Sequence, residues 1–205
     1  PRKVAAMPAE DREKWTADMT AHWKGENGEL VNDGKGKYAT TVKDYGFMFR
    51  TDPAYAAKAA KISAMTRDVS ELMAELGLEG AAAPEKLAVA YHSACSMQHG
   101  QGIVAQPRAL LAKAGFALRE IPEGHLCCGS AGTYNMLQPA LARRLQARKA
   151  ANIAHVNPDI VATGNIGCMV QIAGATRIPV VHTVQLLDWA TGGPKPPALE
   201  RVNRT

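Results

Sequence analysis

The four cysteines of the chain constrain its fold more than any other feature. Cys127 and Cys128 are adjacent and are followed by Gly129, whereas Cys95 and Cys168 lie far from this pair along the sequence. Three chemistries use adjacent cysteines: a vicinal disulfide, a metal site and an iron–sulfur cluster. If one site needs all four thiols, the fold must bring three distant segments together.

Each cysteine group follows a short apolar run, at residues 87–91, 117–121 and 159–163. Short runs of this kind, bounded by glycine and proline, are typical of buried parallel strands. In an open α/β sheet, ligands bind beyond the carboxyl ends of the strands. We therefore predict an α/β fold with a parallel sheet, Rossmann-like in arrangement and flanked by helices, in which the cysteines meet at the carboxyl edge.

The spacing of the cysteines also bears on what they bind. Structural zinc usually takes pairs of cysteines separated by a few residues. Adjacent residues have Cα atoms about 3.8 Å apart and side chains that tend to diverge, so their thiolates more easily hold two irons of one cluster than one small ion. Iron–sulfur clusters are typically held by four cysteine thiolates. The spacing favours a cluster, with zinc and redox-active thiols as the alternatives.

The residues around the cysteines resemble the cysteine-rich CCG module, and over residues 28–198 the chain is similar to the C-terminal part of the glycolate oxidase iron–sulfur subunit family. That family is related to the cysteine-rich component of heterodisulfide reductase. The segments that carry the resemblance are 41–46, 91–100, 125–135, 163–168 and 186–190.

The resemblance implies that Cys95, Cys127, Cys128 and Cys168 are metal ligands. The family motif ends in C-x-x-C, but this chain has Asn165 at the first of those two positions. The five-cysteine noncubane clusters of heterodisulfide reductase are therefore not expected. Four cysteines are enough for an ordinary [4Fe–4S] cluster.

Several residues beside the cysteines are candidates for cofactor binding. Gly129, Gly132 and Gly167 would let backbone N–H groups approach cluster sulfurs, and such hydrogen bonds raise a reduction potential. Ordinary turn glycines are the alternative interpretation. We expect Asn165 to donate a hydrogen bond to a sulfur.

Two histidines near the cysteines are further candidates. His92 and His125 could donate hydrogen bonds to the cluster or carry protons beside it. The alternative for each is a structural histidine with no role in the site.

The resemblance implies an electron-transfer subunit of a glycolate oxidase or dehydrogenase complex, and no residue of this chain is then a catalytic acid or base. Electrons would come from FAD on a partner flavoprotein and would reach an acceptor such as quinone. Two alternatives stay open: a thiol/disulfide redox enzyme of the heterodisulfide reductase type, and a zinc-bound or metal-free docking module.

The domain organisation follows from a weak internal duplication. We interpret residues 1–80 as the C-terminal half of a first CCG-like repeat plus a linking helix, 81–198 as a complete second repeat, and 199–205 as a tail. A helix is predicted at 8–24 and a strand at 29–32. The turn at 33–38 contains no cysteine, so we expect no first cluster in this chain, which we interpret as a fragment.

The pattern also predicts the other helices. Pro53 and Gly77 bound one long helix over 53–76, and a second is expected between 102 and 115 with its start at Gln106. A third starts near Pro139, and the last contains Leu186, Leu187 and Trp189. For the third helix we expect Leu141, Leu145 and Ile153 to face inward, and Arg143, Arg144, Arg148 and Lys149 to form a solvated face.

Charge and hydropathy exclude some functions. The net charge of +5 is not concentrated in a basic helix with interleaved aromatic residues, so nucleic acid is not expected as a partner. No apolar run is long enough to span a bilayer, and no signal peptide is apparent. Four cysteines in 205 residues suit a reducing cytoplasm. We expect a cytoplasmic protein, with peripheral contact with the inner face of the membrane as an additional hypothesis.

Overall fold

The computed structural model describes residues 39–200, which lie within one compact unit, Lys35–Thr205. The predicted helix at 8–24, the strand at 29–32 and the turn at 33–38 lie outside the described residues. The boundary that we place at residue 80 stays a prediction.

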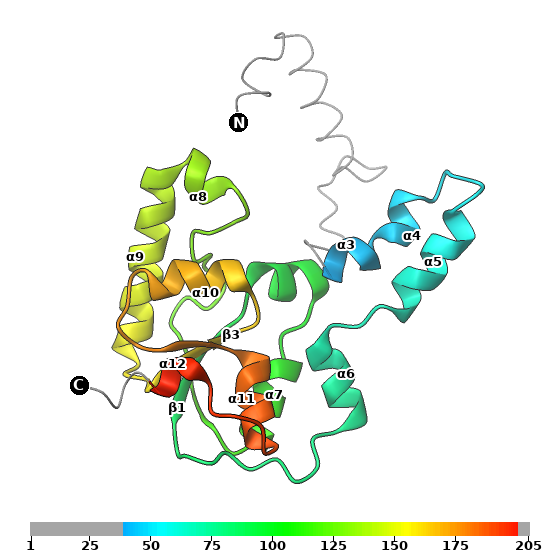
Figure 1. Cartoon of the computed structure of the whole chain (residues 1–205). Coiled ribbons are helices and arrows are strands. Elements are labelled where there is room, and N and C mark those ends of the chain that lie inside the picture. The colour runs from blue at the N-terminus through cyan, green and yellow to red at the C-terminus, as the bar shows by residue number, and fades with distance from the viewer. Residues whose placement is uncertain (1–38, 201–205) are drawn as a thin grey trace. The chain divides into compact units, whose positions relative to one another are not determined.

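A four-stranded parallel sheet forms the centre of the described part (Figure 1). Its strands are β1 (Ala88–His92), β2 (Ala117–Arg119), β3 (Ile160–Thr163) and β4 (Val180–His182), in the order β2-β1-β3-β4. All three pairings are parallel. The predicted α/β fold is confirmed. After β2 the chain crosses to the other side of β1, so the gap between β1 and β3 is a topological switch point.

Helices cover both faces of this sheet, which explains why its central strands, β1 and β3, are mostly apolar and almost completely buried. The flanking helices are α7 (Gln106–Lys113) and α11 (Thr183–Ala190) on one face and α9 (Pro139–His155) and α10 (Ile166–Ala173) on the other. Alternate residues of β1 serve the two faces: Val89 packs with the first pair of helices and Ala90 with the second. Cys128 and Cys168 belong to the core beside α9 and α10.

The predicted helix over 53–76 is wrong as a single element, because the structure contains two helices, α5 (Ala56–Met65) and α6 (Val69–Leu76). The break begins at Thr66, whose backbone is extended. Asp68 then starts α6 with a capping box: its side chain accepts from Ser70 N–H, and the Glu71 side chain accepts from Asp68 N–H. These bonds satisfy backbone donors that a new helix start leaves unpaired.

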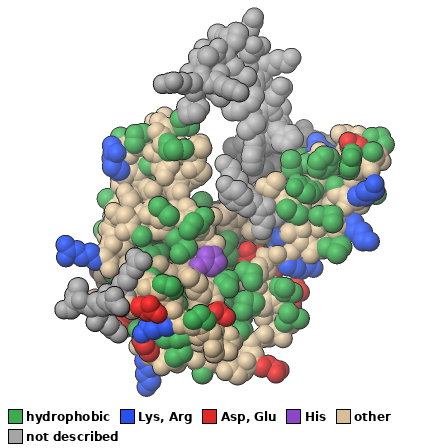
Figure 2. Space-filling model, in the orientation of Figure 1, with side chains coloured by type: hydrophobic (Ala, Val, Ile, Leu, Met, Phe, Trp, Pro, Cys, Tyr) green, Lys and Arg blue, Asp and Glu red, His purple; other side chains and the backbone are tan. Residues whose placement is uncertain are grey.

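Two short helices, α3 (Ala39–Lys43) and α4 (Tyr45–Met48), precede α5 and pack on it. Ser63 of α5 ties them together, because its hydroxyl accepts from Gly46 N–H at 2.7 Å and donates to the Val42 carbonyl at 3.0 Å. Figure 2 shows apolar side chains gathered over this part of the visible face. Exposed apolar residues there include Met48, Tyr55, Ile62 and Met65.

The helix predicted from Pro139 is confirmed as α9, but the prediction of its inward face is partly wrong. Leu141 is 46% exposed, whereas Lys149, expected in solvent, is fully buried. Ala142, Lys149 and Ile153 are the buried residues of this helix. Arg143, Arg144 and Arg148 are exposed as predicted.

The end of the described part packs on the core. A last short helix, α12 (Pro197–Glu200), places Leu199 in the core beside α11, and the Lys195 ammonium lies 5.4 Å from the centre of the Trp189 ring. Among the described residues, no helix combines the length and the apolar character that a membrane span requires.

Candidate metal centre

The candidate site lies beyond the carboxyl ends of β1 and β3, at the switch point. His92 is the last residue of β1. Cys95 follows it and starts a π-helix, η1 (Ser96–Gln101), a rare element that is frequent at functional sites. Cys168 lies in the first turn of α10, which follows β3. The sheet topology therefore positions residues from distant segments at one edge, as the sequence predicts.

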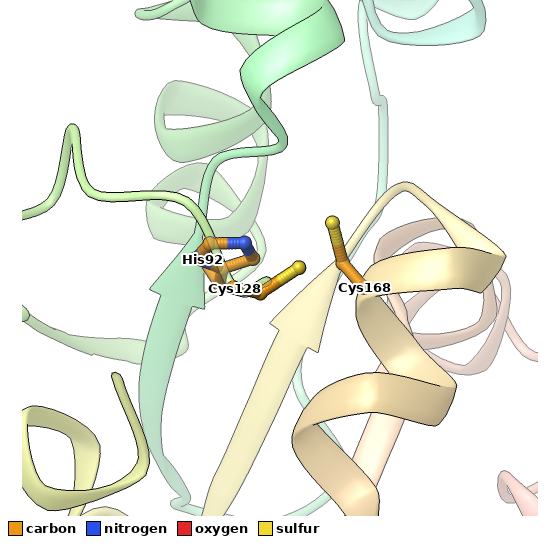
Figure 3. Close-up of side chains that lie close together, drawn as sticks. All are labelled: His92, Cys128 and Cys168. Atoms are coloured by element: carbon orange, nitrogen blue, oxygen red, sulfur yellow. The ribbon is translucent and has the colours of Figure 1, made fainter. Parts of the chain in front are cut away.

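Three side chains form the tightest group in this site. A ring nitrogen of His92 and the sulfurs of Cys128 and Cys168 all lie within 4.8 Å of one another, and all three residues are buried (Figure 3). Figure 3 shows that they come from the end of β1, a loop and the start of α10. Nitrogen and sulfur donors at this separation can bind one metal ion or part of a cluster.

The other two cysteines extend this group. Cys95 and Cys127 are half-buried, and all four cysteines are free thiols. Side-chain hydrogen bonds link Cys95 to Cys127, Cys127 to Cys128 and Cys128 to Cys168. The structure therefore brings together the four thiols that the sequence singles out.

These contacts make the four thiols unequal. Hydrogen bonds from Cys128 and Cys95 lower the pKa of Cys127, and a hydrogen bond from Cys128 lowers the pKa of Cys168. The same bonds, together with burial, raise the pKa of Cys95 and of Cys128. Two thiolates that each accept from a neighbouring thiol are ready metal ligands, because a metal binds the deprotonated form.

Gly129 is required by the geometry of the Cys127-Cys128-Gly129 turn. Its N–H donates to Cys127 Sγ at 3.3 Å, and its predicted role beside a cluster stays a prediction. Its φ is +94°, and a Cβ here would collide with the Ala142 carbonyl of α9. Only glycine lets the backbone turn in this way against the helix.

The other predicted glycines lie close to the same turn. Gly132 has a φ of +63°, in the loop that leads to α8 (Tyr134–Leu137). A Cβ on Gly167 would lie 2.8 Å from Ser130 Oγ, so this glycine allows α10 to approach the segment after Cys128. A role for either glycine in binding a cofactor stays a prediction.

Asn165 has a structural task that the sequence interpretation missed. It is the N-cap of α10, and its Oδ1 accepts from Cys168 N–H at 3.1 Å. An asparagine three residues before a cysteine at a helix start is a recognisable cap signal. The cap fixes the backbone that carries the Cys168 thiol; the predicted hydrogen bond to a sulfur stays a prediction.

The two predicted histidines differ in their surroundings. His92 is 2% exposed and contacts Cys168, and this contact helps to lower the pKa of that thiol. Its ring nitrogens make no hydrogen bond to nitrogen or oxygen within the described part of the chain. A buried imidazole in such surroundings is costly, which fits a group that completes its bonding with a ligand. His125 is exposed, and its charge acts on Glu123.

Lys149 is a site residue that we did not predict. Its Nζ donates to the Glu123 carbonyl at 3.0 Å, and charge interactions with Cys128, Glu123, Cys127 and Cys168, the cysteines acting when deprotonated, raise its pKa. Burial lowers the pKa of Lys149 more strongly than these charges raise it. Lys149 lies on the same stripe of α9 as Ala142 and Ile153, and this helical periodicity could have predicted its burial.

The residues present fit an iron–sulfur cluster better than a purely structural role. Thiolates and imidazole are the ligands that iron and zinc take in proteins. The four thiols form a continuous series of contacts, and a backbone N–H already donates to one sulfur. The buried histidine beside Cys168 makes no hydrogen bond to nitrogen or oxygen among the described residues. A core without a ligand would not retain such a set of polar groups.

Comparisons with known proteins agree with this geometry. The family model for the cysteine-rich domain called CCG matches residues 89–173. The chain is 38% identical over 149 residues to the glycolate oxidase iron-sulfur subunit of Escherichia coli strain K12, an alignment that covers 73% of this chain and 37% of that protein.

More distant relatives share much of the same region. Lactate utilization protein A of Oceanobacillus iheyensis is 25% identical over 169 residues, covering 79% of this chain and 69% of that protein. The protein of the same name from Bacillus subtilis strain 168 is 24% identical over 170 residues, covering 80% and 71%. The segment 89–173, which contains all four cysteines, is therefore a CCG cysteine-rich domain by its match to the family model.

Proposed function

We propose that this chain is an iron–sulfur electron-transfer part of a glycolate oxidase or dehydrogenase complex. The observation that carries the proposal is the contact of four thiols from three segments at the switch point of the sheet. Similarity to a glycolate oxidase iron-sulfur subunit supports the same function. The chain spans little more than a third of that subunit, so the complex as a whole is part of the proposal.

In this proposal Cys95, Cys127, Cys128 and Cys168 hold one [4Fe–4S] cluster, which supplies one-electron transfer when bound. Gly129 N–H donates to the Cys127 sulfur, and a bond of this kind favours the reduced state. His92 faces the same space and has ring nitrogens available to a sulfur. The buried surroundings of Cys128 and Cys168 keep water from these ligands.

The proposed partners follow from the same function. A flavoprotein subunit would carry FAD and oxidise the hydroxy acid, and this chain would pass the electrons toward an acceptor such as quinone. Peripheral contact with the inner face of a membrane would give access to that acceptor. Because none of these steps needs an acid or base here, the chain itself is non-catalytic.

Anaerobic preparation of the protein and of Cys128→Ser tests the proposal. We expect the unmodified protein to contain about four irons and four sulfides per cluster, to absorb visible light, and to give an EPR signal on reduction. Cys128→Ser should lose most of the iron and the visible absorption, because Cys128 contacts two of the other three thiols.

Ser130→Ala is the matched control. It removes a buried hydroxyl two residues from Cys128, keeps the backbone of the turn, and should retain the iron. Colourless, iron-free protein from anaerobic cells would contradict the proposal, as would an unchanged spectrum in Cys128→Ser.

A single zinc ion is the second candidate, and one observation favours it. Among residues 39–200, His92, Cys128 and Cys168 form the group tight enough for one ion, and two cysteines with one histidine can serve as zinc ligands. In that case the anaerobic protein would contain one zinc and no sulfide, and His92→Ala would lose the metal.

A further inference from the structure

The strongest feature that the proposed function leaves unused is a lysine inside the core. Lys149 lies on the buried face of α9 and has no exposed surface. Lysine is almost never fully buried without a partner, because moving an ammonium out of water costs several kilocalories per mole. A specific negative charge nearby would offset that cost.

The Glu123 carbonyl is the direct hydrogen-bond partner of Lys149, at 3.0 Å from Nζ. The carbonyl is neutral and leaves the positive charge uncompensated. The Glu123 backbone has a φ of 52°, a conformation that non-glycine residues rarely adopt.

The Glu123 carboxylate already accepts hydrogen bonds from two other side chains. Its oxygens accept from the Arg148 guanidinium and from Asn152 Nδ2, the latter at 2.8 Å. Arg148 is exposed, so this pair lies toward the surface. The carboxylate is therefore shared with a second cation, and its effect on Lys149 is smaller than that of Cys128.

The other groups whose charge acts on Lys149 are the cysteines. Cys128 has the largest effect once a metal deprotonates its thiol, and Cys127 and Cys168 contribute as well. Cys128 lies in the same core cluster as Ile153, one turn along α9 from Lys149. Lys149 thus lies on the buried stripe of α9 that packs beside the cysteines, which are thiolates once a metal is bound.

We propose that Lys149 is the charge-compensating residue of the thiolate site, holding one buried positive charge beside the cysteines so that a metal centre with net negative charge is retained and more easily reduced. The effect on reduction rests on the proposed iron–sulfur function, whereas the effect on metal retention needs only the thiolates. Lys149 acts through the field of its ammonium and does not touch the centre.

The physical reason concerns the sign of the charge. A [4Fe–4S] cluster with four thiolates is an anion, and reduction adds a further negative charge. A nearby buried cation stabilises the reduced state more than the oxidised state, since interactions between charges are weakly screened away from water. Removing the cation should therefore shift the reduction equilibrium toward the oxidised form.

The test compares the protein with Lys149→Met and Lys149→Gln, using EPR-monitored redox titration of the anaerobic protein. Methionine removes the charge with little change in volume. Glutamine removes the charge but keeps an N–H donor for the Glu123 carbonyl, so it remains informative if methionine prevents folding. For both we expect at least a tenfold shift toward the oxidised form, which corresponds to about 59 mV for one electron.

Arg144→Met is the matched control, because it removes one positive charge from an exposed position of the same helix. Its reduction equilibrium should stay within twofold of that of the unmodified protein. Lys149→Arg keeps the charge and should restore the equilibrium toward the unmodified value if the larger group is accommodated.

A second measurement does not depend on the cluster. Metal-free protein is titrated with Co²⁺ under argon, and binding is followed by sulfur-to-cobalt charge-transfer absorption. A divalent ion with three or four thiolates has a net negative charge, so Lys149→Met and Lys149→Gln should bind Co²⁺ about tenfold more weakly, while Arg144→Met should bind as the unmodified protein does.

The outcomes separate the two proposals. If the unmodified protein assembles no cluster but the Co²⁺ affinities differ as expected, the iron–sulfur function fails and the role of Lys149 stands. If folded Lys149 variants match Arg144→Met in Co²⁺ affinity, and in reduction potential wherever a cluster assembles, Lys149 is only a structural lysine and the inference is overturned.

Discussion

At the scale of single residues, the Cys127-Cys128-Gly129 turn combines two ligands with one backbone conformation. Gly129 donates its N–H to the first sulfur and passes against the Ala142 carbonyl, where no side chain fits. The turn thereby lets Cys127 contact Cys95 while Cys128 contacts Cys168. The two adjacent cysteines can then act as ligands at opposite ends of the site.

Gly129→Ala tests whether close packing, in addition to backbone strain, requires glycine at position 129. The strain of a positive φ costs about 1–3 kcal/mol, and the collision with Ala142 should add about 1–3 kcal/mol. Gly192→Ala is the control, because Gly192 has a similar φ of +99° and open space around the missing Cβ. In urea unfolding of the metal-free protein, Gly129→Ala should lower the free energy of unfolding more than Gly192→Ala does. Equal losses in the two variants would show that packing against Ala142 is irrelevant.

At the scale of elements, α6 depends on an ion pair as well as a capping box. Glu71 accepts from Asp68 N–H at 2.8 Å and from the Lys43 ammonium of α3 at 2.5 Å. Burial alone would raise the pKa of Glu71, but the bonds from Lys43 and the Asp68 backbone outweigh it, and the net pKa lies below the ordinary value of 4.5. The ionised carboxylate therefore joins α6 to the helices that precede it.

This ion pair predicts a pH dependence of stability. Because the pKa of Glu71 is lower in the folded state than in the unfolded state, its contribution is complete above pH 4.5 and is lost as the pH falls through the folded value. Glu71→Gln should lower the free energy of unfolding by about 1 kcal/mol at pH 7, with a difference that shrinks below pH 4.5.

The exposed Glu75 of the same helix, which pairs with Arg67, provides the control Glu75→Gln, expected to change stability by less than about 0.5 kcal/mol. Denaturant unfolding at several pH values is the measurement. If Glu71→Gln lowers the free energy of unfolding by the same amount from neutral pH into the acid range, ionisation of Glu71 is not the cause.

The elements also show what the sequence could and could not predict. The strands and α9 follow from apolar runs bounded by glycine and proline, so the sequence predicts them. The break between α5 and α6 escapes prediction because apolar periodicity continues across it, although Asp68 and Glu71 have the spacing of a capping box. The π-helix η1 has no sequence signature of its own; it depends on how Cys95 leaves β1.

At the scale of the whole molecule, the order β2-β1-β3-β4 creates the site. The connections from β1 and β3 leave the sheet on opposite sides, and the space between them receives His92, Cys128 and Cys168. The convergence of the cysteines could be predicted because parallel strands align their carboxyl ends. The positions of His92 and Lys149 inside the core could not, because burial of a polar side chain depends on the packing of distant segments.

X-ray absorption spectroscopy of the anaerobically prepared protein tests most directly whether the four thiols share one inorganic centre. We expect an iron edge, a first shell made of sulfur only, and scattering from neighbouring irons, all of which should disappear in Cys128→Ser. A zinc edge with one imidazole nitrogen among the ligands, or a single iron without iron neighbours, would contradict this expectation.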